Sequence, residues 1–404
     1  MKKQTKISFI GDLTVDKPLL NYSHIGNNKF DFDKVFHRVK DDFRDSDLVI
    51  GNLETTFAGS DNYLNTEFML LNTPDEFAES IKKANINILT TANNHTLDKD
   101  IDGLKRTINL LDNLNIEHTG TYVDKKDYEN ILIKEVNGVK LAFISATYGI
   151  NDTNIDFKFN KENSFHIDVL RSQETIFPNT FNGRVKKIIT KIFSKKFIRK
   201  AKRIYSRYKI KKHGKFLNIY VDTIKSKDFS NEYLERFLGK VIKAKEDCDY
   251  VFVMPHMGGQ FNKKPGPYSV KLMNLLLNLD VNVLANHPHV IQKIVTKNKN
   301  VGVYSIGSFN MSVSGDYVVR DSLPQYSLGV HFYFDKSFLV KSTYSIFIIS
   351  ECESGSIEVY PLQDYFERLS IDSKEKMLIE INSIHKRIGL NNTGIEKEYL
   401  IKNY

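Results

Sequence analysis

Residues 281–289, Val-Asn-Val-Leu-Ala-Asn-His-Pro-His, join a short apolar run to two histidines that are separated by a single residue. An apolar run of this length that is rich in valine and leucine and ends in polar residues predicts a buried strand. Side chains alternate along an extended chain, and Pro288 favours extended backbone at the residue before it. We therefore expect the imidazoles of His287 and His289 to face one common centre.

Four other apolar runs end in the same kind of residue. Asp12 follows residues 7–10, Glu54 follows 47–50, Asn94 and His95 follow 86–89, and His256 follows 250–253. In layered α/β proteins, the loops at the carboxyl ends of the strands converge on one crevice, and the sheet beneath holds them in place. The pattern therefore predicts one site, formed by Asp12, Glu54, Asn94, His256, His287 and His289.

The chemistry of this set of side chains favours a divalent metal. Carboxylate, amide oxygen and imidazole donors without a thiolate suit Mn²⁺, Fe or Zn²⁺, and a carboxylate can bridge two such ions. Any one of these residues alone is more commonly a cap or a satisfied polar group, so the interpretation rests on the whole set. We expect two bound ions and metal-dependent hydrolysis.

Composition narrows the class of protein. The chain has 404 residues, of which 41% are hydrophobic and 26% charged, which is enough for one large core or two modest ones. Cys248 and Cys352 lie far apart, which indicates a reducing compartment. The sequence shows no apolar stretch typical of a membrane-spanning helix or a signal peptide. We expect a cytoplasmic protein, with peripheral attachment to the cytoplasmic membrane and an extracytoplasmic location as open alternatives.

The order of the patterns predicts a mixed α/β (α+β) protein. Strand-like and helix-like runs alternate over the first 150 residues, with helices expected at 74–81 and 104–114. Antiparallel strands are expected from 326 to 349 and from 356 to 360, and mostly helical structure from 374 to 404. We predict a main domain over 1–345, an insertion over 151–230 and a C-terminal strand and helical extension over 346–404.

The insertion contains a strongly basic segment. Residues 184–215 hold 15 Lys or Arg and no Asp or Glu, and the rest of the chain has a formal charge of 9 − 15 = −6. Apolar residues recur at helical spacing, which predicts a basic amphipathic helix. It could lie on an anionic membrane, bind a polyanion, or pack its apolar stripe onto the domain. No nucleic acid is expected. The candidate contact residues are Lys186, Lys187, Lys195, Lys196, Arg199, Lys200, Lys202 and Arg203.

Six short motifs occur in order along residues 6–310. They are Gly11-Asp12, Asn52-Leu53-Glu54, Asn93-Asn94-His95, His256-Met257-Gly258, His287-Pro288-His289 and Tyr304-Ser305-Ile306-Gly307. Together they resemble the CapA family of bacterial capsule-synthesis proteins. That family is best known from poly-γ-glutamate capsule systems, and it looks like a branch of the calcineurin-like metallophosphoesterase superfamily. The resemblance implies a two-sheet β-sandwich flanked by helices.

The resemblance also implies roles for the site residues. Glu54 would bridge two ions, one held by Asn94, His256 and His287 and the other by Asp12 and His289. His95 would act as general acid or transition-state stabiliser. Asp98 would either orient that imidazole or simply begin a helix. Thr14 stands where the superfamily usually has a second histidine, which implies a weakly held first ion.

The resemblance and the basic segment lead to two hypotheses for the function. One is a metal-dependent hydrolase of the phosphoesterase type that uses a metal-activated water. It would act on a phosphoester or an anionic polymer in the biosynthesis of a bacterial capsule, poly-γ-glutamate or another exopolymer. The alternative is a non-catalytic accessory protein that binds a polyanion, or docks on the membrane or the capsule synthesis machinery, through residues 184–215.

Overall fold

The computed structural model describes most of the chain outside the predicted insertion. The basic segment 184–215, with its eight candidate residues from Lys186 to Arg203, lies outside the described residues, so the amphipathic helix predicted there stays a prediction. The described residues are 4–59, 63, 70–151, 162–171, 173, 222–225, 227–315, 317–352 and 356–404.

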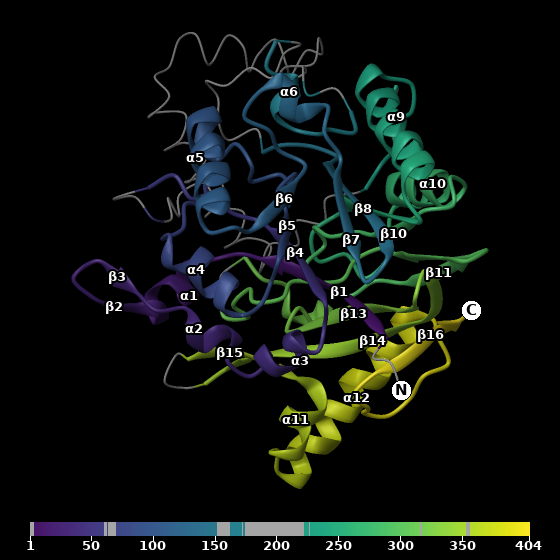
Figure 1. The fold of residues 1–404 in the computed structure, drawn as a ribbon. Helices are drawn as coiled ribbons and strands as arrows, with labels where there is room; N and C mark the ends of the chain where they lie inside the picture. The colour runs from purple at the N-terminus through teal and green to yellow at the C-terminus, as the bar shows by residue number, and fades with distance from the viewer. Residues whose placement is uncertain are drawn as a thin grey trace, which may run out of the picture.

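Two β-sheets form the centre of the molecule (Figure 1). The larger sheet has the order β15-β14-β13-β1-β4-β5-β6, with β16 also paired to β14. Its strands are β1 (Thr5–Leu13), β4 (Leu48–Leu53), β5 (Ile88–Thr90), β6 (Glu117–Thr119), β13 (Tyr326–Asp335), β14 (Phe338–Glu351), β15 (Ile357–Pro361) and β16 (Tyr399–Asn403).

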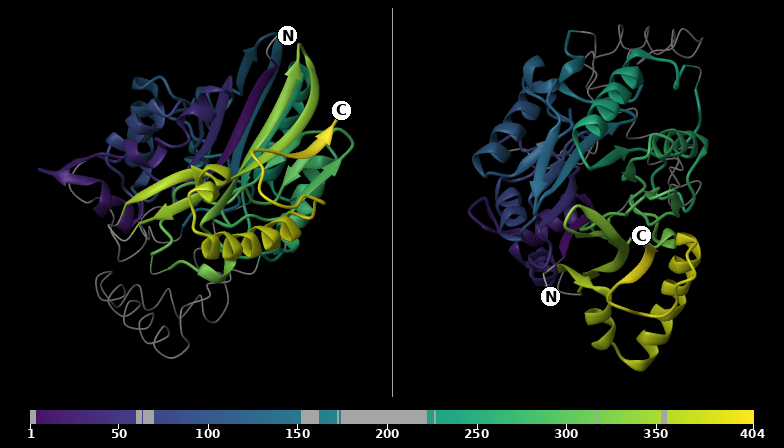
Figure 2. Two further views of the ribbon diagram at one scale, coloured as in Figure 1. Left: turned by 90° about the horizontal axis from the view of Figure 1, so that it is seen from below. Right: turned by 45° about the vertical axis from the view of Figure 1, so that its right-hand side comes forward.

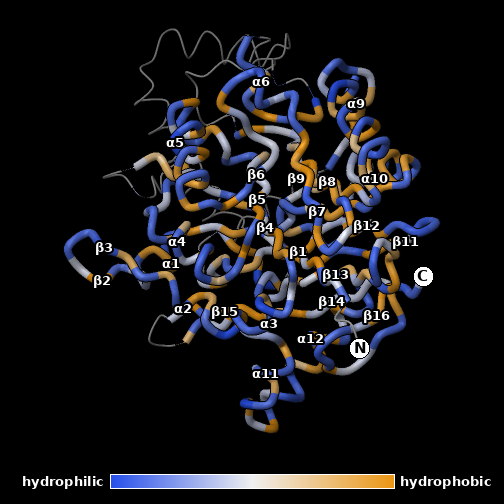
Figure 3. The backbone as a smooth tube through the Cα atoms, viewed as in Figure 1, coloured by the Kyte–Doolittle hydropathy of each residue, from blue (hydrophilic) through white to orange (hydrophobic). Residues whose placement is uncertain are grey.

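The smaller sheet has the order β11-β12-β10-β9-β8-β7. Its strands are β7 (Leu132–Val136), β8 (Val139–Thr147), β9 (Tyr250–His256), β10 (Asn282–Leu284), β11 (Ile294–Lys297) and β12 (Asn300–Val303). A separate hairpin pairs β2 (His24–Gly26) with β3 (Lys29–Phe30). The turns at the tips of the β2–β3 and β11–β12 hairpins are hydrophilic and lie at the periphery (Figure 3).

Parallel strands form one side of the larger sheet and the middle of the smaller sheet. In the larger sheet β1, β4, β5 and β6 are parallel, and in the smaller sheet β8, β9, β10 and β12 are parallel. Asn52 in β4 lies 3.3 Å from His256 at the end of β9, measured from Nδ2 to Nδ1. The parallel strands of both sheets therefore end at the same place, which is where the sequence predicted a site.

The two sheets pack face to face around a buried apolar core. Because side chains alternate along a strand, Ile7 and Phe9 of β1 point inward, toward Phe143 and Phe252 of the smaller sheet. The ring centroids of Phe9 and Phe252 are 4.8 Å apart. Parallel strands covered on both faces have continuous apolar sequences, as the runs in this chain do.

Helices cover the outer faces of the sandwich. α1 to α4 pack on the larger sheet and α9 and α10 on the smaller one. The predicted two-sheet sandwich flanked by helices is therefore confirmed. The helices are α1 (Lys17–Ser23), α2 (Asp33–Phe36), α3 (Lys40–Arg44), α4 (Glu76–Lys83), α5 (Asp100–Asn113), α6 (Lys125–Tyr128), α9 (Glu232–Asp247), α10 (Pro267–Leu277), α11 (Leu362–Glu367) and α12 (Ile371–Ile388). Within the described ranges, none of them is long and apolar enough to cross a membrane.

The C-terminal region differs from the predicted extension. The expected boundary at residue 345 falls inside β14, and β15 and β16 both extend the larger sheet through β14. The predicted helix ends at Ile388, because Gly389 adopts a left-handed conformation with φ of 82°, and β16 follows. Figure 2 shows the C-terminal helices, in yellow, against one end of the sandwich. Residues after 345 therefore complete the main domain.

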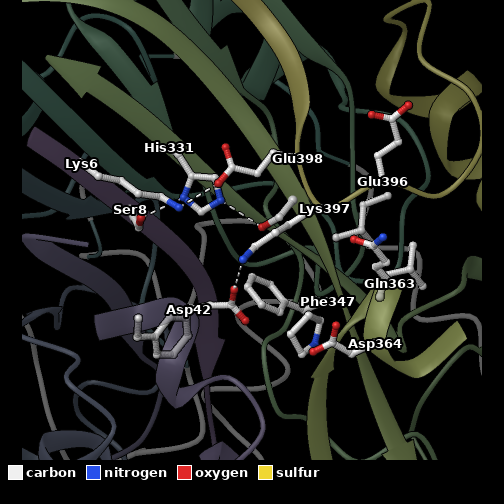
Figure 4. A pocket seen from close by; sticks show the side chains of 15 residues that line it. Lys6, Ser8, Asp42, His331, Phe347, Gln363, Asp364, Glu396, Lys397 and Glu398 are labelled. Carbon is white, nitrogen blue, oxygen red and sulfur yellow. Dashed lines mark hydrogen bonds and ion pairs between the residues drawn. The ribbon is translucent and has the colours of Figure 1, made fainter. Parts of the chain in front are cut away.

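A cavity of about 70 Å³ lies where the first strand meets the last segments (Figure 4). Four of its charged groups form two ion pairs: Lys6 Nζ lies 2.8 Å from Glu398 Oε1, and Lys397 Nζ lies 3.4 Å from Asp42 Oδ1. His331 lies between two serine hydroxyls. This cluster joins the chain near Glu398 to the beginning of β1.

The pKa of Glu398 predicts a pH-dependent contribution to stability. Burial would raise this pKa, but the surrounding His331, Lys6 and Tyr333 together lower it to about 2. A carboxylate with a lowered pKa stabilises the fold above its ordinary pKa, and this stabilisation is lost as the pH falls toward 2. Glu398→Gln should reduce the free energy of unfolding at pH 7 by roughly 2 kcal/mol, allowing for partial exposure.

Urea unfolding at several pH values between 7 and 3 measures this effect. The difference between Glu398→Gln and the native protein should shrink as the pH falls below 4.5. Glu396→Gln is the matched control, since Glu396 is exposed and lies in the same segment. An equal loss of stability in both variants would show that the ion pair with Lys6 has no special role.

Candidate metal centre

The six predicted ligands lie together at the carboxyl ends of the parallel strands. Asp12 lies near the end of β1, Glu54 directly follows β4, and His256 is the last residue of β9. The other three follow β5 and β10. All six side chains are buried, with exposed fractions between 0% and 6%. The prediction that separate strand ends converge is therefore confirmed for this set of residues.

The ligand atoms form two groups that share one carboxylate. Glu54, His256 and His287 bring one atom each to within 4.8 Å of one another, and so do Asp12, Glu54 and His289. The Asn94 carbonyl oxygen lies 2.7 Å from His256 Nε2, which places it beside the first group. The residues of the two groups are those that the family resemblance implies for two ions.

The surroundings of the shared Glu54 carboxylate indicate whether these residues fit a metal ion. Both of its oxygens are buried and have no hydrogen-bond partner among the residues that the structure describes. The nearest imidazole nitrogens are 3.4 Å away in His256 and 3.6 Å away in His289. A buried carboxylate without donors is costly unless a cation compensates it. Because the surrounding donors are oxygen and imidazole nitrogen, the residues fit a divalent cation.

Burial and mutual charge shift the pKa values in the centre in opposite directions. Burial and the charge of Glu54 raise the pKa of Asp12, although the hydrogen bond from His289 opposes them. The pKa of Glu54 is lowered, since His289 and His256 outweigh its burial. Burial lowers the pKa of His289, but the two carboxylates raise it to about 9. Burial and His256 lower the pKa of His287, so it is neutral. The centre therefore combines the charged carboxylate of Glu54 with the neutral imidazole of His287.

Two asparagines that we did not predict as site residues hold the ligands in place. Asn52 Nδ2 donates to Asp12 Oδ1 at 2.7 Å, and Asn52 Oδ1 accepts from the Thr90 hydroxyl at 2.9 Å. Asn93 Nδ2 donates to the backbone carbonyl of Leu53 at 2.6 Å, beside Glu54. Both asparagines belong to the motifs that suggested the family, so the signal was present in the sequence.

The backbone of the histidine pair differs from the expected extended form. His287 has φ of 104° and His289 has φ of 57°, so both lie in the left-handed region. The prediction of an extended His-x-His was therefore wrong. Backbone hydrogen bonds curl this loop: Met257 N–H donates to Asn286 O, and Phe261 N–H donates to Pro288 O. The strain costs about 1–3 kcal/mol per residue and is typical of functional sites.

His95 and Asp98 form a buried pair beside the centre. His95 Nδ1 lies 2.6 Å from Asp98 Oδ2, and the Leu71 backbone N–H donates to the same oxygen at 2.6 Å. Lys99, rather than Asp98, occupies the N-cap position of α5. Of the two roles that we considered for Asp98, the geometry therefore favours orienting the imidazole. His95 Nε2 is then the nitrogen that Asp98 leaves free.

Thr14, which we noted in place of a second histidine, forms two hydrogen bonds through its backbone. The Thr14 N–H donates to Asn310 Oδ1 at 3.0 Å, and its carbonyl accepts from Asn310 Nδ2 at 3.0 Å. These bonds connect the end of β1 to the segment after β12. Thr14 therefore holds the chain beside Asp12, and among the described residues the second ligand group consists of Asp12, Glu54 and His289.

The fold and the centre define a class of protein: a two-sheet α/β sandwich with a buried carboxylate–histidine–amide centre at its strand ends. Residues 6–312 match the family described as "Bacterial capsule synthesis protein PGA_cap". This match covers most of the chain, so the protein belongs to that family. The resemblance inferred from the motifs is confirmed.

Two curated relatives carry the name CapA. The capsule biosynthesis protein CapA of Bacillus anthracis is 23% identical over 309 residues, which are 74% of this chain and 59% of that protein. The PGA biosynthesis protein CapA of Bacillus subtilis (strain 168) is 23% identical over 324 residues, which are 80% of this chain and 67% of that protein. This chain therefore spans about three fifths to two thirds of the length of these relatives.

One solved structure aligns with nearly the whole chain at low similarity. It is a crystal structure of a putative 5'-nucleotidase from Staphylococcus aureus in complex with alpha-ketoglutarate. The alignment covers 94% of this chain and 58% of that chain, with 12% identity and a TM-score of 0.40. A likeness at this level does not bear on function.

The pair formed by His95 and Asp98 predicts a change in titration. Burial would lower the pKa of His95, but the charge and hydrogen bond of Asp98 raise it. A raised pKa means that the pair stabilises the fold below pH 6.5 and that this effect is lost as the pH rises through the pKa of His95. In Asp98→Asn, His95 should titrate at lower pH, and the loss of stability should be larger at pH 6 than at pH 9.

Histidine-selective NMR titration of the chelator-treated protein measures this pKa. The control is Asp102→Asn, which removes the same charge from an exposed position of α5. Titration of His95 at an unchanged pH in Asp98→Asn would mean that another group sets its protonation.

Proposed function

We propose that this protein is a metal-dependent hydrolase of the phosphoesterase type that acts in the formation of a bacterial capsule, poly-γ-glutamate or a related exopolymer. The observation that carries the proposal is the shared carboxylate of Glu54, which is buried between two ligand groups and receives no hydrogen bond from the part of the chain that the structure describes. Membership of the capsule synthesis family supports the polymer context. The substrate would be a phosphoester or an anionic polymer.

The two ligand groups would hold two ions, for which Mn²⁺, Fe and Zn²⁺ are all suitable. Glu54, Asn94, His256 and His287 would form one site, and Glu54, Asp12 and His289 the other. When bound, such ions lower the pKa of water and neutralise charge on phosphoryl oxygens. Because the second group contains fewer protein ligands, we propose that its ion is held more weakly.

His95 would supply the proton for the leaving group. Its Nδ1 is engaged by Asp98 at 2.6 Å, which fixes the ring and stabilises the protonated imidazole. Asn151 Nδ2 lies 3.2 Å from the same nitrogen and packs beside the ring. Asp98 therefore has a positioning role, and His95 Nε2 is the atom that would exchange a proton with substrate.

A second proposal is a binding role for the basic segment. The 15 lysines and arginines of residues 184–215 favour an anionic polymer or an anionic membrane surface as partner. Through this segment the protein would act as an accessory of the capsule synthesis machinery, with or without catalysis. A location in the cytoplasm, at the inner face of the membrane, agrees with this role and is likewise a proposal.

Metal counting tests the hydrolase proposal. After loading with Mn²⁺ and dialysis, the native protein should retain about two ions per chain. His287→Ala and His289→Ala should each lose about one, and Glu54→Gln should weaken both sites, because Glu54 belongs to both groups. His24→Ala is the control, since His24 is exposed, and it should retain both ions. Elemental analysis provides the count.

Turnover tests the roles of the side chains. Hydrolysis of bis-p-nitrophenyl phosphate should fall by about 10²- to 10⁴-fold in His95→Ala with the metal count unchanged. It should fall at least as far in His287→Ala. A native protein without turnover, whose binding to anionic vesicles or poly-γ-glutamate disappears when residues 184–215 are deleted, would support the accessory role instead.

A further inference from the structure

The two ring nitrogens of His287 have different surroundings. Nδ1 lies 2.9 Å from His256 Nε2, within the first ligand group. Nε2 lies 3.2 Å from the hydroxyl of Tyr148. A neutral imidazole carries its proton on only one of the two nitrogens, and the nitrogen without the proton is the one that can bind a metal. Whichever nitrogen carries the proton therefore decides whether His287 can serve as a ligand.

Tyr148 is fixed in position by contacts on several sides. It directly follows β8, and its backbone N–H donates to the His256 carbonyl at 3.0 Å. Its own carbonyl accepts from Arg171 Nε at 2.6 Å, and the Arg171 guanidinium lies 4.7 Å from the centre of its ring. The ring of Tyr268 packs against it with centroids 6.3 Å apart. The hydroxyl therefore has a defined place beside His287.

We propose that Tyr148 is a positioning residue that accepts the Nε2–H of His287 and so keeps the lone pair of Nδ1 directed at the first ligand group. Arg171 supports it by holding the phenol ring and the backbone carbonyl. This inference rests on the metal centre of the proposed function. A hydrogen bond that fixes the tautomer of a ligating histidine typically changes metal affinity by 10- to 100-fold when it is removed.

The chain offers a closely matched control for this role. Tyr148→Phe removes the hydroxyl and retains the ring that contacts Arg171. Tyr268→Phe removes a hydroxyl from the neighbouring ring, and that hydroxyl is buried without a hydrogen-bond partner among the described residues. Both substitutions make the same chemical change in the same cluster of aromatic rings. A difference between them therefore reports on the bond to His287.

Two measurements test the proposal without relying on catalysis. Calorimetric titration of the chelator-treated protein with Mn²⁺ should show affinity at one site about 10- to 100-fold lower in Tyr148→Phe and unchanged in Tyr268→Phe. Nitrogen NMR of the metal-free protein, with ¹⁵N-labelled histidine, should show the Nε2–H tautomer of His287 in the native protein and in Tyr268→Phe. A mixture of tautomers is expected in Tyr148→Phe.

The outcomes separate this inference from the proposed function. An Nδ1–H tautomer in the native protein, or equal Mn²⁺ affinity in the two variants, would overturn the role of Tyr148. A native protein that binds Mn²⁺ without hydrolysing any phosphodiester would contradict the proposed function and leave the comparison of the variants valid. If the native protein bound no Mn²⁺, both the metal centre and the positioning role would fail.

Discussion

The buried charge of Glu54 is the constraint around which the centre is built. A carboxylate in this environment must be balanced, and four buried histidines and the hydrogen-bonded Asp12 surround it. These residues come from the ends of β1, β5, β9 and β10, which belong to both sheets, so the charge is balanced only when the two sheets are in register. Asn52 connects the sheets at this point by contacting Asp12 on one side and His256 on the other. The fold and the electrostatics of the centre therefore depend on each other.

The sequence predicted the parts of the fold that have strong local patterns. The apolar runs before Asp12, Glu54 and His256 became buried strands, because residues of this type favour a sheet covered on both faces. β16 was missed, since a short, partly exposed strand owes its existence to pairing with β14. The expected boundary at residue 345 fell inside a long strand, since no glycine or proline marks a break there.

For the site, too, the sequence predicted only the residues that lie in strong local patterns. Polar residues at strand ends were found, because their chemistry is evident in the sequence and strand ends converge. Tyr148 and Asn151 reach the centre, and Arg171 contacts Tyr148, because β8 lies beside β9, and chain order alone does not give that neighbour relation. The left-handed backbone of His287 was not predicted either, since that conformation is imposed by hydrogen bonds to the loop after β9. Tertiary context overrode the local preference for extended structure before a proline.

The pairing of β1 has a consequence for how the protein is made. β1 lies between β4, which is close in the chain, and β13, with Thr5 opposite Phe334. On the ribosome, one edge of this apolar strand stays unpaired until some three hundred further residues have emerged. Open strand edges invite pairing between chains, and contacts of such long sequence separation form slowly. Newly synthesised chains therefore pass through a long aggregation-prone interval, during which chaperones that shield apolar edges would raise the yield of folded protein.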